Sequence, residues 1–188
     1  MRIVGGMHRG RVLVAPKGHS TRPTADRTRQ AIFNILEHAA WSPGLEGRRA
    51  IDLFAGAGAL GLEALSRGAA FCLFVDTDAA ARAAIGANVQ ALRLESRARV
   101  DGRDATRLGP APESGEKFDL AFLDPPYGQG LNEPALAALA KGGWLAPGAL
   151  IVVERGTGEA PLAVPGFEIV DSRGWGAARV EFLRSVIG

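Results

Sequence analysis

The sequence contains a single cysteine, Cys72, so no disulfide can form within one chain. This cysteine lies in the apolar run 71–75, which favours a small buried core residue over a reactive thiol. The three histidines are scattered and share no metal-ligand spacing with Cys72. They are His8, His19 and His38. We therefore expect neither a disulfide framework nor a bound metal.

Long hydrophobic runs are also missing. No apolar stretch approaches the roughly 20 residues that a membrane-spanning helix needs, and the first six residues lack the apolar core of a signal peptide. The chain has 188 residues, of which 47% are hydrophobic and 22% charged, as in ordinary globular proteins. These absences predict a cytoplasmic protein with no membrane partner, folded as a single domain.

The charge is unevenly distributed along the chain. The net charge is +2, but residues 1–29 carry seven basic side chains and one acidic one, which leaves the remainder at −4. A basic N-terminal arm on a mildly acidic body favours a polyanionic partner such as a nucleic acid. The alternative is a solvated arginine-rich segment, in which Arg27 and Arg29 pair with Asp26 or Glu37 on a helix surface.

The pattern of apolar residues predicts a doubly wound α/β fold, Rossmann-like, with an N-terminal extension. Residues 1–45 form the extension, with a hairpin from 2–4 and 11–14 and a helix over about 24–40; residues 46–188 form the core. We expect core helices at 59–67, 78–92 and 132–140, and a loop at 104–117. The seven expected strands are 50–54, 71–75, 97–101, 118–123 and 149–154, with 167–170 and 179–183 as a closing antiparallel pair.

A glycine-rich loop follows the first core strand. Gly56, Gly58 and Gly61 satisfy the G-x-G-x-x-G pattern, and glycines there let the backbone approach a ligand. Asp76 ends the next strand about 20 residues later, where a carboxylate binds a ribose in dinucleotide-binding proteins. This loop alone leaves a nicotinamide-dependent oxidoreductase open. However, Asp52, just before the glycines, would repel a pyrophosphate and suits the cationic end of S-adenosylmethionine.

The most specific signal is the tetrapeptide Asp124-Pro125-Pro126-Tyr127, at the end of the fourth strand. Carboxyl ends of the strands meet at the ligand crevice, so it should lie beside the glycine loop. An exocyclic base amine is a poor nucleophile, and two acceptors, the Asp124 carboxylate and the Pro125 carbonyl, could orient its lone pair. The prolines lock the turn, and Tyr127 can stack on an extruded base. These residues predict methyl transfer to an exocyclic amine.

Taken together, these motifs resemble the RsmD family of bacterial 16S ribosomal RNA guanine-N2 methyltransferases. The similarity covers nearly the whole chain and is carried by residues 2–11, 22–34, 52–69, 124–127 and 142–145. The resemblance implies that Asp52, the glycine loop and Asp76 bind S-adenosylmethionine, that Asp104 lies near its adenine, and that the segment 22–29 packs over it. From these we expect further cofactor contacts by Phe54, Thr77, Ala105, Asp124, Thr24 and Arg27.

The resemblance also implies a partner and a role for the arm. The expected substrate is a guanine of 16S rRNA on an assembled or partly assembled 30S subunit, modified by a monomeric enzyme. The expected RNA contacts in the arm are Arg9, Arg11, Lys17 and Arg22. Two other functions remain open beside the nicotinamide enzyme: a DNA adenine-N6 methyltransferase, since the tetrapeptide does not distinguish the bases, and a non-catalytic RNA-binding or assembly factor.

Overall fold

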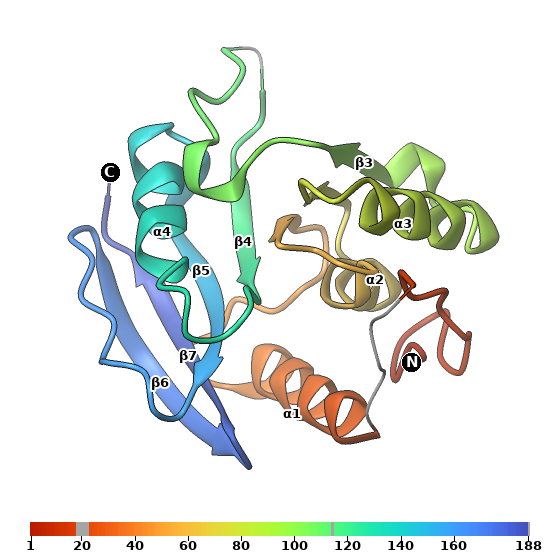
Figure 1. Ribbon diagram of the computed structural model, residues 1–188, viewed down its shortest axis with the longest axis horizontal. Helices are drawn as coiled ribbons and strands as arrows, with labels where there is room; N and C mark the ends of the chain where they lie inside the picture. The colour runs from red at the N-terminus through yellow and green to blue at the C-terminus, as the bar shows by residue number, and fades with distance from the viewer. Residues whose placement is uncertain (18–22, 114, 188) are drawn as a thin grey trace.

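The computed structural model describes residues 1–17, 23–113 and 115–187. Figure 1 shows the order of the elements along the chain. The helices are α1 (Pro23–His38), α2 (Ala59–Ser66), α3 (Ala79–Ala91) and α4 (Asn132–Lys141), with short 3-10 turns η1 (Glu95–Arg97) and η2 (Ala105–Arg107). The strands are β1 (Arg49–Leu53), β2 (Phe71–Val75), β3 (Ala98–Asp101), β4 (Phe118–Leu123), β5 (Leu145–Gly156), β6 (Phe167–Trp175) and β7 (Ala178–Ser185).

The strands form one seven-stranded sheet in the order β3-β2-β1-β4-β5-β7-β6. The strands from β3 to β5 pair in parallel, whereas β7 runs antiparallel to both of its neighbours, β5 and β6. The predicted doubly wound α/β fold with an antiparallel C-terminal strand is confirmed. Because the strand order reverses between β1 and β4, their carboxyl ends border the crevice in which such folds bind ligands.

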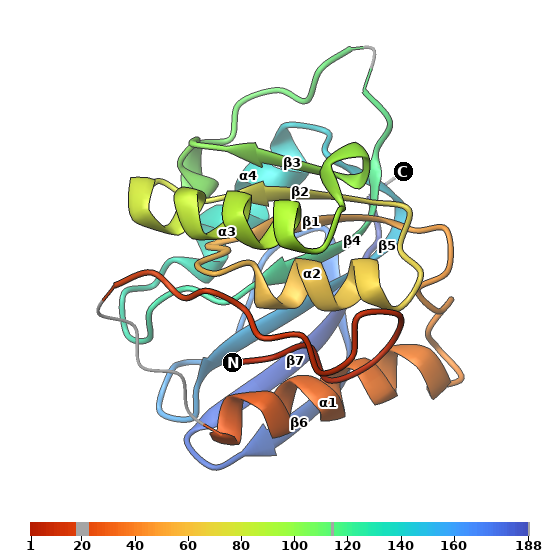
Figure 2. The same ribbon diagram turned by 90° about the vertical axis from the view of Figure 1, so that its right-hand side faces the viewer.

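Helices cover the sheet on both faces. In Figures 1 and 2, α1, α2 and α3 lie on one face and α4 lies on the other. Side chains alternate along each strand. Phe74, Phe122 and Val152 face the first layer, and Leu123 and Val153 face the second. This two-sided burial explains why the central strands read as continuous apolar runs.

Several boundaries differ from the sequence-based expectation. The first core strand begins at Arg49 and ends at Leu53, because Phe54 has a φ of 57° and turns the chain out of the sheet. The fifth strand, expected at 149–154, spans Leu145–Gly156 and contains an irregularity opposite β4. The N-terminal helix begins one residue earlier, at Pro23, and ends at His38. None of the helices in the described ranges is long and apolar enough to cross a membrane.

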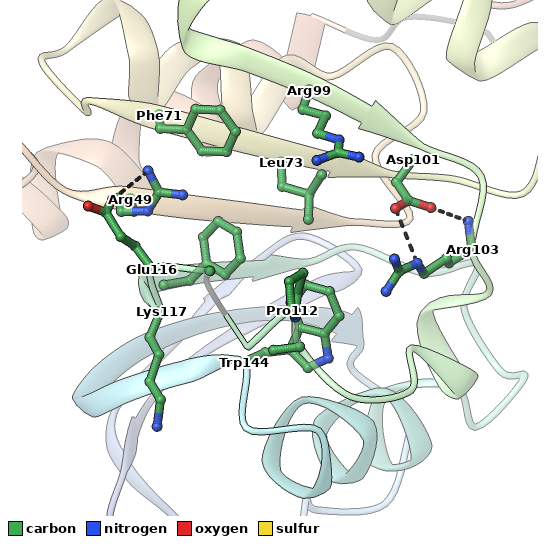
Figure 3. A pocket seen from close by; sticks show the side chains of 13 residues that line it. Arg49, Phe71, Leu73, Arg99, Asp101, Arg103, Pro112, Glu116, Lys117 and Trp144 are labelled. Atoms are coloured by element: carbon green, nitrogen blue, oxygen red, sulfur yellow. Dashed lines mark hydrogen bonds and ion pairs between the residues drawn. The ribbon is translucent and has the colours of Figure 1, made fainter.

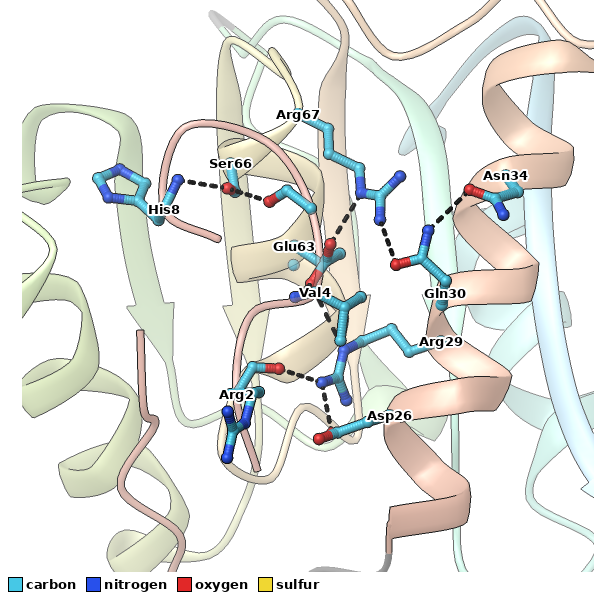
Figure 4. A network of polar contacts seen from close by, with 12 residues as sticks. Arg2, Val4, His8, Asp26, Arg29, Gln30, Asn34, Glu63, Ser66 and Arg67 are labelled. Atoms are coloured by element: carbon cyan, nitrogen blue, oxygen red, sulfur yellow. Dashed lines mark hydrogen bonds and ion pairs between the residues drawn. The ribbon is translucent and has the colours of Figure 1, made fainter. Parts of the chain in front are cut away.

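The expected N-terminal hairpin forms only a single bridge, between Arg2 and Val12. Its two arms are still joined by backbone hydrogen bonds, such as that from the Ile3 N–H to the Arg11 carbonyl at 3.0 Å. The hairpin is held mainly by α2 (Figure 4). Glu63 accepts a hydrogen bond from the Val4 N–H at 3.0 Å, and the Ser66 hydroxyl donates to the Gly5 carbonyl at 2.7 Å.

Candidate active site

A cleft of about 970 Å³ opens at the carboxyl ends of β1, β2, β3 and β4. Its walls come from the loops that follow these strands, including 54–60, 76–78, 103–106 and 124–127. This volume lies at the upper end of ordinary small-molecule sites. The cleft brings together these predicted site residues: Asp52, Phe54, Gly56, Asp76, Thr77, Asp104, Ala105, Asp124, Pro125, Pro126 and Tyr127.

Each of the three glycines in the loop has a different structural role. Gly56 has a φ of 57° and open space where a side chain would begin, so the loop leaves room at the cleft. Gly58 has a φ of 79° and caps α2. At Gly61, a β-carbon would lie 2.4 Å from the Phe74 ring and 2.6 Å from Cys72, so this glycine lets α2 pack on β2. Gly58 and Gly61 shape the loop without lining the cleft.

Asp52 forms part of the cleft floor and is only 1% exposed. Its carboxylate accepts a hydrogen bond from the Gly61 N–H at 2.9 Å, which ties β1 to the start of α2. Burial raises the pKa of Asp52 to about 8; the nearby charge of Asp76 also raises it, while the Gly61 hydrogen bond lowers it. At neutral pH this acid is therefore poised to ionise beside a cation.

Asp76 and Asp104 are fixed at the ends of β2 and β3. Asp76 accepts hydrogen bonds from the N–H groups of Gly56 and Asp78, both at 2.9 Å. Asp104 accepts from the Thr106 hydroxyl at 2.7 Å and from its N–H at 2.8 Å. The side-chain hydrogen bond from Thr106 contributes most to lowering the pKa of Asp104. Both carboxylates are thus held rigidly at the cleft.

Asp124 follows β4 directly and is exposed to the cleft. The surrounding protein limits its solvation and raises its pKa, and the nearby acids Glu154 and Asp52 raise it further. Tyr127 is 47% exposed, and its hydroxyl donates a hydrogen bond to Glu154 Oε1 at 2.7 Å. The tetrapeptide therefore presents both a carboxylate and a partly open aromatic ring to the cleft.

Two residues that the sequence reasoning missed brace this loop from β5 and the turn that follows. Glu154 holds the Tyr127 hydroxyl, and Glu159 Oε1 accepts hydrogen bonds from the N–H groups of Gly128 at 2.8 Å and Gly156 at 3.3 Å. Glu154 lies near the carboxyl end of the fifth strand, which neighbours the fourth strand in a sheet of this type. This position was the signal in the sequence that could have indicated a place beside the tetrapeptide.

The N-terminal arm borders the cleft through Met1, Ala15 and Pro16. Asn88 of α3 fixes the arm there, because its amide nitrogen donates to the carbonyls of Val14 at 2.9 Å and Ala57 at 3.0 Å. The arm is thus tied to the glycine loop through one buried side chain.

Of the arm's predicted contacts, Arg9, Arg11 and Lys17 are exposed. Arg27 is exposed and does not line the cleft. Arg22 and the side chain of Thr24 lie outside the described residues. The roles predicted for these residues remain predictions.

Arg29 belongs to a buried network instead of the exposed surface (Figure 4). Its guanidinium lies 2.8 Å from Asp26 and 3.6 Å from the fully buried Glu63. Glu63 also pairs with Arg67 at 2.8 Å, and Arg67 pairs with Glu37 at 2.8 Å. Part of the arm's positive charge is therefore neutralised inside the protein.

A second hollow, of about 230 Å³, lies near the amino ends of β1, β2 and β4 (Figure 3). Arg49 stacks on Phe71 with its guanidinium carbon 4.5 Å from the ring centre and pairs with Glu116 at 3.0 Å. Arg103 is the one residue that lines both this hollow and the cleft. Within the described ranges, no group of three or more His, Cys, Asp or Glu side chains is placed to hold a metal ion.

The chain has the Rossmann-like fold of S-adenosylmethionine-dependent methyltransferases, with the cleft at the carboxyl ends of the parallel strands. At 19% identity and a TM-score of 0.63, the chain shares the fold of a Thermus thermophilus 16S rRNA N2 methyltransferase solved with AdoMet and guanosine, over 91% of this chain and 45% of that one. The Escherichia coli protein yhhF is more similar, with a TM-score of 0.85 and 32% identity over 100% of this chain and 99% of that one.

The sequence model of the family described as "Conserved hypothetical protein 95" matches residues 1–184. The Escherichia coli ribosomal RNA small subunit methyltransferase D is 40% identical over 82% of this chain and 74% of its own length. Its Haemophilus influenzae counterpart is 36% identical over 88% of this chain and 83% of its own length. The chain belongs to this family, the RsmD family, as the sequence motifs indicated.

Proposed function

We propose that this protein transfers a methyl group from S-adenosylmethionine to the exocyclic N2 amine of a guanine in 16S rRNA, presented on an assembled or partly assembled 30S subunit. It would act as a monomer, with residues 46–188 as the catalytic core. The relatives named as small-subunit rRNA methyltransferases support this substrate class. The observation that carries the proposal is that Asp124 and Tyr127 share one cleft with Asp52, Gly56 and Asp76.

The residues of the cleft fit S-adenosylmethionine. When bound, this cofactor supplies an electrophilic methyl group on a positively charged sulfur. Asp76 would accept hydrogen bonds from the ribose hydroxyls, and Gly56 leaves room for the ligand beside it. Asp52 would face the cationic end, since a buried acid gains most from an opposite charge nearby. Asp104 would lie near the adenine.

The tetrapeptide would hold the base. The Asp124 carboxylate and the Pro125 carbonyl would accept hydrogen bonds from the two N–H groups of the amine and turn its lone pair toward the methyl group. Tyr127 would stack on the extruded base, a contact worth about 1–3 kcal/mol. The pKa of Asp124 is raised because the surrounding protein limits its solvation and because Glu154 and Asp52 lie nearby. Positive charge in the cleft would favour the ionised form of this acid. It is therefore suited to accept hydrogen bonds after the cofactor has bound.

Replacing the proposed acceptor tests this function. Asp124→Asn should reduce transfer of labelled methyl to small-subunit rRNA by at least 100-fold, because Asn offers one acceptor and a competing N–H donor. Binding of S-adenosylmethionine, measured by calorimetry, should change by less than about tenfold. Asp119→Asn is the matched control, since Asp119 lies on β4, does not line the cleft and pairs with Arg48 at 3.8 Å. Undiminished transfer by Asp124→Asn would refute the role of this acid.

A further inference from the structure

Asp124 and Glu154 each follow one member of a pair of residues that lie in register. Leu123 of β4 pairs with Val153 of β5; Glu154 is the next residue of β5, and Asp124 is the first residue after β4 ends. Phe122 and Val152 lie two residues before these acids, and their side chains face the layer formed by α1, α2 and α3. Side chains alternate along a strand, and neighbouring strands lie about 4.8 Å apart. The two carboxylates are thus neighbours at this edge of the sheet, and Glu154 lies near enough for its charge to raise the pKa of Asp124.

Glu154 is held in one orientation by Tyr127. The tyrosine hydroxyl donates to Glu154 Oε1 at 2.7 Å. Burial raises the pKa of Glu154 above its usual value, and this hydrogen bond opposes part of that rise. Within the described ranges, no group donates a hydrogen bond to the second oxygen, Oε2. One oxygen therefore fixes the side chain. Glu154 does not itself line the cleft, but its neighbours Asp124 and Tyr127 do, so a base held by these two residues would lie close to the second oxygen.

This arrangement has a consequence for the choice of base. In guanine the N2 amine lies beside N1–H, so its edge offers adjacent donors. In adenine the N6 amine lies beside an unprotonated N1, which is an acceptor. Two neighbouring carboxylates can accept from both donors of guanine, whereas adenine would place its N1 lone pair against a carboxylate. A site built around a hydrogen bond rejects analogues that lack the donor far more strongly than it rejects a change in size.

We propose that Glu154 selects guanine over adenine by accepting a hydrogen bond from N1–H through Oε2, while Asp124 holds the neighbouring amine. This inference rests on the proposed function, because it assigns a specificity-determining residue to the same reaction. Tyr127 then has two tasks: its ring stacks on the base, and its hydroxyl keeps Glu154 in the reading position.

The test compares guanine with 2-aminopurine, which keeps the 2-amino group but has an acceptor at N1. Once the methylated nucleotide is mapped, small subunits are reconstituted with either base at that position. The wild-type protein should methylate guanine with a kcat/KM at least 100-fold above that for 2-aminopurine. Glu154→Gln should lower this ratio at least 30-fold. The Tyr127 hydroxyl would hold the carboxamide oxygen, so the amide N–H group would face N1, where it can donate to 2-aminopurine but opposes the N1–H of guanine.

Matched variants separate reading of the base from support of the loop. Glu159→Gln changes the other acid that braces the loop and should leave the ratio within about threefold of wild type. Glu154→Asp keeps a carboxylate and should lower the rate while the preference for guanine survives. Tyr127→Phe keeps the ring and should weaken the preference less than Glu154→Gln does.

An unchanged ratio in Glu154→Gln, with cofactor binding intact, would overturn the inference. So would equal rates on the two bases in the wild-type protein. If the wild-type protein methylates no guanine at all, it is the proposed function that fails, and the two failures are therefore distinguishable.

Discussion

Asp52 is buried, and its carboxylate accepts a hydrogen bond from the backbone N–H of Gly61. Burying an ionised carboxylate is costly unless it is paired. Its pKa is raised to about 8 chiefly by burial, so the folded protein keeps a proton that the unfolded chain loses near pH 3.8. The folded state thus loses stability as pH rises from about 4 through 8. A residue that costs stability in this way, in the floor of the cleft, is best explained by a cationic ligand.

Asp52→Asn should therefore separate stability from binding. At pH 9 the variant should be more stable than the wild type by a few kcal/mol, because one unit of pKa difference corresponds to about 1.4 kcal/mol. At pH 5 the difference should largely disappear. Binding of S-adenosylmethionine should weaken at least tenfold. Urea denaturation at both pH values and calorimetric titration measure these effects. A variant less stable than the wild type at pH 9 would contradict this view of Asp52.

The N-terminal hairpin, α1 and α2 are joined through Glu63. This side chain is fully buried, yet it accepts hydrogen bonds from the Val4 N–H and the Arg67 guanidinium and lies 3.6 Å from Arg29. The arm is therefore anchored at the helix that begins at the glycine loop. We therefore expect a change in the conformation of the arm to alter the shape of the cleft, and a change in the cleft to alter the arm.

Glu63→Ala should destabilise the protein by about 3–5 kcal/mol, because it leaves two buried arginines without their shared partner. The measurement is the free energy of unfolding in urea. Glu95→Ala, which removes an exposed acid from η1, should change it by less than about 0.5 kcal/mol. A loss of stability no larger than that of the control would show that the network contributes little.

The predictable elements were those buried on both faces. The sequence predicted β4 at its observed bounds, because its apolar run has one plausible place in a parallel sheet. The turn at Phe54 and the irregular start of β5 escaped prediction, since both depend on how the chain leaves or joins the sheet. The hairpin was predicted as a pair of strands, but contacts with α2 replace most of the ladder.

The candidate site was predictable to the extent that strand ends define it. Asp52, Asp76 and Asp124 gather because the carboxyl ends of parallel strands meet at one edge. The bracing acids Glu154 and Glu159 were missed, because their partners are a tyrosine hydroxyl and a backbone N–H of the same loop. The place of Glu154 near the carboxyl end of the fifth strand was a signal, but it does not reveal these contacts, and Glu159 had no such signal.

The molecule carries its exposed positive charge on the N-terminal arm and several acidic side chains in the cleft that the arm borders. Arg9, Arg11 and Lys17 are exposed on the arm, whose ends border the cleft through Met1 and Pro16. Exposed cations attract a phosphate backbone, while the acids of the cleft suit a cofactor and an amine. Lys17 lies next to Pro16 at the cleft, whereas Arg9 and Arg11 lie at the hairpin tip, beside the carboxyl ends of α2 and α3. We therefore expect RNA to contact the arm away from the cleft as well as at its mouth.

Replacing Arg9, Arg11 and Lys17 together with alanine should weaken binding to small-subunit rRNA. The slope of log K against log salt should fall in magnitude by up to about 2–3, since each phosphate contact contributes roughly 0.7–0.9. The control is a triple variant at other exposed basic positions, Lys117, Lys141 and Arg173, which changes the net charge equally. Equal slopes for the two variants would argue against a specific role of the arm.

The nucleoside that receives the methyl group identifies the reaction, and nucleoside analysis measures it. Small ribosomal subunits from a strain that lacks the gene are incubated with the protein and labelled S-adenosylmethionine, and the RNA is digested to nucleosides. We predict label in N2-methylguanosine. Label in another nucleoside, or methylation of adenine in duplex DNA in place of rRNA, would refute the proposed function.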